Sequence, residues 1–169
     1  KESIGFLNDK KILILGVGDL AQAILYLLVK EGVKDITITN RTYHKALEVQ
    51  SVFDVNVINF EKKYLAAAEN DVIISATSAP HLVLTKEELL PLLNREKKYT
   101  FLDLAMPRDI DPELSSEENI DLFNLDDIWK VYNKNLKTRD ELMQSYSFLI
   151  DKQMVNLKKW FQYYEERKI

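Results

Sequence analysis

The chain has 169 residues, of which 46% are hydrophobic and 30% are charged, and its formal net charge is -4. This composition is typical of one globular domain with an appendage. No block of Lys and Arg and no run of 18 apolar residues occurs, so we expect no direct nucleic-acid site and no membrane span. The cysteine count of zero excludes disulfides, thiolate metal sites and a cysteine nucleophile within this chain. No secretion leader is visible, so we expect a cytoplasmic protein. We also expect no metal site. Because the chain begins with Lys1 and not Met, we expect it to be a piece of a longer protein.

Hydrophobic patterning predicts strands alternating with helices along most of the chain. Strands are expected at residues 11–15, 35–39, 55–58, 71–75, 99–104 and 120–123. Helices are expected at residues 19–30, 42–52, 64–69 and 86–93, with Thr42 and Thr85 as N-caps, Gly32 past the end of the first helix and Pro91 poorly placed in the last. This alternation predicts an α/β fold, a doubly wound parallel sheet of the Rossmann type.

The pattern changes at Asp126. From there to Ile169 no Gly or Pro occurs, and apolar residues recur at steps of three, four or seven. We therefore predict two parts, a Rossmann domain at residues 1–125 and a long C-terminal helix at 126–169, which reaches roughly 60 Å at about 1.5 Å per residue. Apolar side chains such as Trp160 and Phe161 favour docking against another domain or subunit. The alternative is a helix broken into two and folded back on the sheet.

The turn after the first strand carries the sequence GVGDLA, the G-x-G-x-x-A form of a dinucleotide fingerprint. Gly16 permits a tight turn, Gly18 lets the backbone approach a pyrophosphate, and Ala21 allows close packing of helix on strand. The pyrophosphate-binding residues that we predict are Gly16, Val17, Gly18, Asp19, Leu20 and Ala21. The alternative is a glycine-rich turn that binds nothing.

The tip of the second strand indicates which dinucleotide is bound. An NAD site usually has an acidic residue here for the ribose 2′-hydroxyl, whereas this chain has Asn40, Arg41 and Thr42. The Arg41 guanidinium suits a 2′-phosphate and can stack on adenine, and Lys45 is a second candidate cation. NADPH is therefore the predicted cofactor. The alternative is that Arg41 is a solvated surface charge, and His44 is expected to be exposed.

Two further loops follow predicted strands and are expected at the same edge of the sheet. Ala76, Thr77 and Ser78 are small enough for a cofactor to lie across them, and Thr77 and Ser78 can contact ribose or nicotinamide. Met106 and Pro107 follow the fifth strand and are expected beside the nicotinamide. A rigid loop with an ion pair from Arg108 to Asp109 or Asp111 is the alternative for the latter segment. His81 is expected to be solvated, and no catalytic residue is assigned.

The segments KILILGVGDLAQAI, ITITNRT, DVIISATSAPHLVLTKEEL and FLDLAMPRDIDPEL together resemble the middle, NADPH-binding domain of glutamyl-tRNA reductases. PRDIDP, residues 107–112, is the most specific piece, and Ser78 stands where family members often have Gly. The resemblance implies reduction of glutamyl-tRNA to glutamate-1-semialdehyde in tetrapyrrole, or haem, biosynthesis. It implies pyrophosphate contacts from residues 16–21, 2′-phosphate contacts from 40–42, and ribose–nicotinamide contacts from 76–78. It further implies homodimerisation through the C-terminal helix.

One departure from that family limits what this chain can do. In the family, a cysteine of a separate N-terminal domain takes the glutamyl group as a thioester, and this chain has no cysteine. We therefore expect the chain to bind NADPH without reducing glutamyl-tRNA by itself. Two alternatives remain: the cofactor domain of a shikimate-type dehydrogenase, which shares the NRT pattern, and a non-enzymatic NADPH-responsive assembly module.

Overall fold

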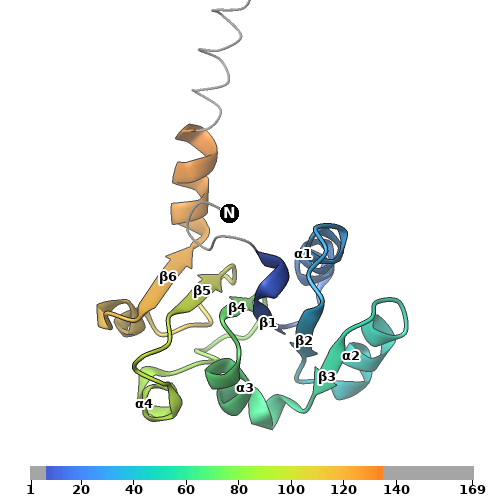
Figure 1. Ribbon diagram of the computed structural model, residues 1–169, viewed down its shortest axis with the longest axis horizontal. Helices are drawn as coiled ribbons and strands as arrows, with labels where there is room; N and C mark the ends of the chain where they lie inside the picture. Colours follow the sequence, from blue (N-terminus) through green and yellow to red (C-terminus); the bar gives the residue numbers. More distant parts are fainter. Residues whose placement is uncertain (1–6, 135–169) are drawn as a thin grey trace, which may run out of the picture. The chain divides into compact units, whose positions relative to one another are not determined.

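The computed structural model describes residues 7–134, and the chain divides into two units, the first ending at Leu125 and the second beginning at Asp126. The first unit is built on a parallel six-stranded sheet, shown in Figure 1. The strands are β1 (Lys11–Leu15), β2 (Asp35–Thr39), β3 (Asn56–Ile58), β4 (Val72–Ser75), β5 (Tyr99–Asp103) and β6 (Ile120–Asn124). The helices are α1 (Asp19–Lys30), α2 (Tyr43–Gln50), α3 (Lys63–Glu69) and α4 (Lys86–Leu89), with short 3₁₀ turns η1 (Leu7–Asp9), η2 (Phe60–Lys62), η3 (Leu90–Leu92) and η4 (Pro112–Ser116). The prediction of a doubly wound parallel sheet is confirmed, because the strand order is β3-β2-β1-β4-β5-β6.

The two faces of the sheet carry separate cores, since successive strand residues point to opposite faces. Ile12 and Ile14 of β1 pack with the buried side of α1 and α2, including Leu25. Leu13 and Leu15 pack with α3, α4 and the aromatic side chains of β5. Each pair of helices therefore covers one face, and β1, buried on both faces, is the central strand that its continuous apolar run predicts.

Several local details differ from the sequence-based expectation. The α-helical turns of α4 end at Leu89 and continue as η3, because Pro91 has no backbone N–H to donate. Thr42 and Thr85 do occupy N-cap positions, but neither side chain makes a capping hydrogen bond, so their predicted capping role is wrong. The cap that sequence reasoning missed is Asp111, whose side chain accepts from the Glu113 N–H at the start of η4.

The carboxyl ends of four neighbouring strands lie level with one another. Leu15 is in register with both Thr39 and Ser75, and Ser75 is in register with Asp103. Backbone hydrogen bonds continue the ladder by one residue, from Gly16 N–H to Thr39 O at 2.8 Å and from Ala76 N–H to Leu15 O at 2.9 Å. The loops after β1, β2, β4 and β5 therefore leave the sheet side by side.

In the second unit, residues 126–134 are helical, and Trp129 stacks on Tyr132 with ring centroids 5.3 Å apart. The predicted continuation to Ile169 and its apolar residues, Trp160 and Phe161 among them, lie outside the described residues. Across residues 7–134, no helix combines the length and the apolar character that crossing a membrane requires.

Candidate functional site

The turn between β1 and α1 contains two glycines in different environments. Gly16 has φ +98°, and a Cβ added there would lie 2.5 Å from the Ala76 carbonyl oxygen. Gly18 has an ordinary φ of -68°, and a Cβ added there would meet no atom within 4 Å. The protein itself thus requires glycine at position 16. At position 18 no described residue requires glycine, so a bound ligand would be the reason for it.

The first turn of α1 faces this open space without a side-chain cap. Gly18 is the N-cap residue and has no side chain to accept from the helix amides. The Gln22 amide group donates to the Val17 carbonyl at 2.8 Å, which fixes the turn from the helix side. A helix N-terminus without a side-chain cap offers amide donors and the positive end of the helix dipole to an anion.

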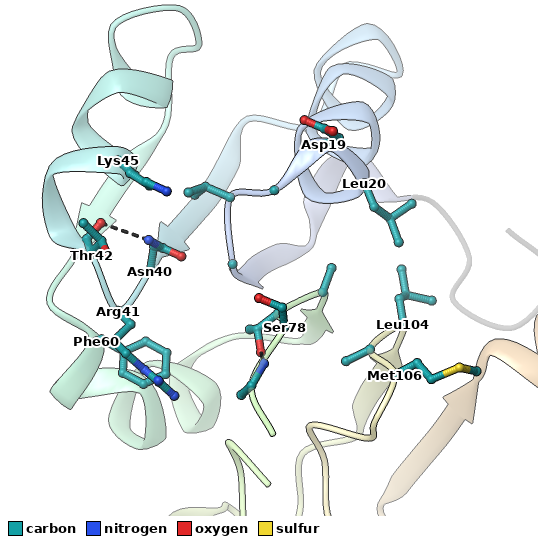
Figure 2. A pocket seen from close by; sticks show the side chains of 17 residues that line it. Asp19, Leu20, Asn40, Arg41, Thr42, Lys45, Phe60, Ser78, Leu104 and Met106 are labelled. Atoms are coloured by element: carbon teal, nitrogen blue, oxygen red, sulfur yellow. Dashed lines mark hydrogen bonds between the residues drawn. The ribbon is translucent and has the colours of Figure 1, made fainter. Parts of the chain in front are cut away.

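Polar and cationic side chains gather at the end of β2. Asn40 Nδ2 donates to the Thr42 carbonyl at 2.9 Å, and Thr39 Oγ1 donates to the Ile58 carbonyl at 2.9 Å, so the strand tip is held in place. In Figure 2, Lys45 points across the pocket toward the start of α1, whereas Arg41 extends alongside Phe60. Within residues 7–134, no ion pair involves Arg41 or Lys45. Both positive charges are therefore available to an anionic ligand.

The neighbouring His44 lies outside this pocket. Its ring is exposed and pairs with Glu48 at 3.1 Å on the surface of α2. His81 is likewise exposed and absent from the pocket lining. Neither histidine is placed to act on a ligand in the pocket.

Two buried carboxylates organise the loops after β4 and β5, and one of them, Asp109, joins the two loops. Asp109 Oδ2 accepts from Ser75 Oγ at 2.6 Å and from Thr77 N–H at 3.0 Å, and Asp109 Oδ1 accepts from Thr77 Oγ1 at 2.7 Å. Asp103 accepts from the backbone N–H groups of Ala105, Asp109 and Ile110 at 3.1–3.3 Å. These contacts connect the tips of both strands to the same loop.

The alternative of an Arg108 ion pair is wrong, because both candidate carboxylates are used elsewhere. Asp109 binds Ser75 and Thr77 as described above, and Asp111 accepts from the N–H groups of Lys86 and Glu113. Arg108 itself is exposed at the loop tip. The acids of this segment therefore organise backbone and hydroxyl groups, and they do not neutralise the arginine.

Behind this loop a half-buried ion pair ties α4 to the end of η4. Lys86 Nζ lies 2.7 Å from Glu117 Oε1 and 3.0 Å from Ser116 Oγ. The hydrogen bond to Glu117 raises the pKa of Lys86, and the same bond lowers the pKa of Glu117. Together with the Val83 and Leu84 amides, which both donate to the Asp109 carbonyl, this contact supports the outer side of the loop.

All four loops border one cavity of about 490 Å³, a volume typical of cofactor sites. Every predicted site residue lines it except Ala21 and Pro107. Ala21 is buried beneath the turn, where it packs in the core, and Pro107 is exposed outside the cavity. The lining residues that sequence reasoning missed are Phe60, Ala79, Leu104 and Ala105. Ala79 and Ala105 directly adjoin predicted residues and Leu104 lies two residues before Met106, whereas Phe60 lies in η2 and carried no sequence signal.

The cavity has two chemically different sides, and Figure 2 shows Ser78 between them. Arg41 and Lys45 are on one side, and the apolar side chains of Leu104 and Met106 are on the other. Within residues 7–134, no group of three or more His, Asp or Glu side chains is arranged to hold a metal ion. The arrangement suits an elongated ligand with an anionic end and a flat, less polar end.

The strand order puts the topological switch point between β1 and β4, and the cavity lies over their carboxyl ends. That combination defines the class: a Rossmann-type α/β domain. A family model described as "Shikimate / quinate 5-dehydrogenase" matches residues 1–131, and the chain belongs to this family.

Individual relatives confirm the resemblance to glutamyl-tRNA reductases. The chain is 51% identical to the glutamyl-tRNA reductase of Fusobacterium nucleatum over 160 residues, covering 94% of this chain and 49% of that protein. The structure of glutamyl-tRNA reductase from Methanopyrus kandleri superposes with a TM-score of 0.81 at 26% identity, covering 99% of this chain and 43% of that one. The nucleotide binding domain of the Thermoplasma volcanium enzyme gives a TM-score of 0.63 at 26% identity, covering 78% of this chain and 86% of that one. The chain thus spans half or less of the full-length relatives it matches.

Proposed function

We propose that this chain is the NADPH-binding part of a glutamyl-tRNA reductase. The observation that carries the proposal is the pairing of an open glycine position, Gly18, with two cations at the tip of the next strand, Arg41 and Lys45. The 51% identity to a glutamyl-tRNA reductase supports the choice of family member. The rival reading, the cofactor domain of a shikimate-type dehydrogenase, shares the fold and the family model, and the 51% identity favours the glutamyl-tRNA reductase.

The cavity fits a dinucleotide in one orientation. The pyrophosphate belongs at the amides that begin α1, in front of Gly18, because that is where backbone is accessible without a Cβ in the way. The adenosine end belongs beside Arg41 and Phe60, where a guanidinium and a ring offer flat surfaces. The nicotinamide end then lies over the loops after β4 and β5, against Leu104 and Met106.

The choice of NADPH over NADH rests on charge. The β2 tip has Asn40, Arg41 and Thr42, with no carboxylate to accept from a ribose 2′-hydroxyl. Charge-assisted bonds from Arg41 and Lys45 suit the 2′-phosphate that distinguishes NADPH. When bound, NADPH supplies the hydride. The residues of this chain bind and orient it.

The reaction of the whole protein needs groups that this chain does not contain. By resemblance, a cysteine holds the glutamyl group as a thioester, and the chain has no cysteine. We propose that glutamyl-tRNA is bound and the thioester formed by a separate domain, and that the helix beginning near Asp126 leads to a homodimer contact. An assay of this chain alone with glutamyl-tRNA and NADPH is expected to give no glutamate-1-semialdehyde.

Calorimetric titration with NADPH and NADH tests the proposal. We expect NADPH to bind at least about tenfold more tightly, and Arg41→Ala or Lys45→Ala to reduce that preference, since each charge-assisted bond is worth roughly 1.5–3 kcal/mol. Arg95→Ala, which removes an exposed arginine outside the cavity, is the charge-matched control. Equal affinity for both nucleotides, or a preference that survives both substitutions, would contradict the proposed role of the two cations.

A further inference from the structure

The Asp109 carboxylate is completely buried, yet it contacts no cation within the described residues. Among residues 7–134, its oxygens accept from Ser75 Oγ, Thr77 N–H and Thr77 Oγ1, at 2.6–3.0 Å. A buried carboxylate is costly unless donors surround it. Ser75 and Asp109 are 34 residues apart in the chain, so this contact joins the end of β4 to the loop that follows β5.

These bonds determine what the Thr77 side chain can do. Its hydroxyl donates to Asp109 at 2.7 Å and accepts from the Ala79 N–H at 3.1 Å. A threonine hydroxyl has one donor hydrogen, so Thr77 has no donor left for a ligand. Ser78 Oγ, directed into the cavity, is the hydroxyl of this loop that remains to contact one.

The same bonds place the backbone of the loop against the glycine turn. The Ala76 carbonyl occupies the space that a Cβ on Gly16 would take, at 2.5 Å. Asp109 lies outside the cavity lining, while residues 76–79 form part of it. Asp109 therefore acts on the cavity through Thr77 and not by touching its contents.

We propose that Asp109 is a positioning residue, whose buried carboxylate holds residues 76–79 in the shape that receives the nicotinamide end of the cofactor. This inference rests on the proposed function, because it assigns the end of the ligand that this loop contacts. The adenosine end, at Arg41 and Lys45, makes no contact with the Asp109 network and is expected to bind independently of it.

Two probes separate the ends of the cavity: NADPH, and adenosine 2′,5′-bisphosphate, which has the adenosine end and no nicotinamide. Asp109→Asn keeps the shape but turns an amide group toward a donor. We expect it to weaken NADPH binding about tenfold and leave bisphosphate binding within about twofold. The fluorescence of bound dihydronicotinamide should shift toward its value in water. Asp111→Asn, which makes the same carboxylate-to-amide change at the cap of η4 two residues away, should affect neither probe.

Ser75→Ala provides a second variant, in case Asp109→Asn does not fold. Ser75 is fully buried and does not line the cavity, so its hydroxyl reaches the ligand only through Asp109. We expect a smaller loss in the same direction, confined to NADPH. Equal weakening of both probes, or unchanged NADPH binding in both folded variants, would overturn the positioning role. Failure of the unsubstituted protein to bind either probe would instead overturn the proposed function itself.

Discussion

The two sides of the cavity are built in different ways. On the side of β1 and β2, the residues that face the ligand space have few contacts of their own: Gly18 has open space before it, and Arg41 and Lys45 are in no ion pair with a described residue. On the side of β4 and β5, Asp109 binds the hydroxyls of Ser75 and Thr77, and Asp103 binds backbone amides of its own loop. On the first side, polar groups are thus available to a ligand. On the second side, they are bonded to other groups of the protein.

This difference predicts which substitutions change ligand affinity and which change the stability of the fold. Substitutions on the first side should change affinity with little effect on folding, because they remove groups that make few native contacts. Substitutions on the second side should lower stability, because they leave buried donors without acceptors. Gly16 lies on the first side of the cavity. Because it approaches the Ala76 carbonyl closely, a substitution there should lower stability, as on the second side.

Gly16→Ala should have the largest effect on stability. A Cβ at 2.5 Å from the Ala76 carbonyl oxygen cannot be accommodated without moving the loop after β4, and φ +98° is unfavourable for alanine. We expect a loss of about 3 kcal/mol or more in the free energy of unfolding, measured by urea denaturation. A variant as stable as the original chain would show that the loop after β4 moves freely.

Asp103→Asn should have the next largest effect. The carboxylate accepts three backbone N–H groups, and an asparagine amide group in its place faces at least one of these donors. We expect a loss of roughly 2 kcal/mol in the free energy of unfolding. Unchanged stability would mean that the loop after β5 does not depend on this network.

Gly18→Ala should reverse the pattern seen at Gly16. An added Cβ meets nothing within 4 Å, so the cost to folding should stay below about 1 kcal/mol, the usual difference between glycine and alanine at an N-cap. NADPH affinity should fall at least about tenfold, because the Cβ occupies the pyrophosphate position. Retained affinity, measured by calorimetry, would remove the glycine turn from the binding site.

Asp71 provides a control away from both sides, at the amino end of β4. Burial raises the pKa of its carboxyl, but the Lys11 N–H bond and Lys97 at 3.1 Å outweigh that effect and lower it. A lowered pKa in the folded state stabilises the fold above pH 4 or so, and this stabilisation is lost as the pH falls through the folded-state pKa. Asp71→Asn should flatten the dependence of stability on acid pH, by less than about 1 kcal/mol. NADPH affinity at neutral pH should not change.

The same division explains what the sequence could predict. The glycine turn and the cations at residues 40–45 are recognisable because each follows its strand within a few residues and acts on the ligand through its own chemistry. The pairing of Ser75 with Asp109 is not recognisable in the sequence, because it depends on how two loops meet in space. Phe60 was missed for the same reason: only the position of η2 beside the β2 tip brings its ring to the cavity.

A crystal structure of this chain with NADPH would show directly where each end of the dinucleotide binds. We expect the diphosphate against the amides at the start of α1, in front of Gly18, with the 2′-phosphate in contact with Arg41 or Lys45. The nicotinamide should lie over residues 76–79. A 2′-phosphate bound elsewhere, or a cavity left empty at saturating NADPH, would contradict the proposed binding site.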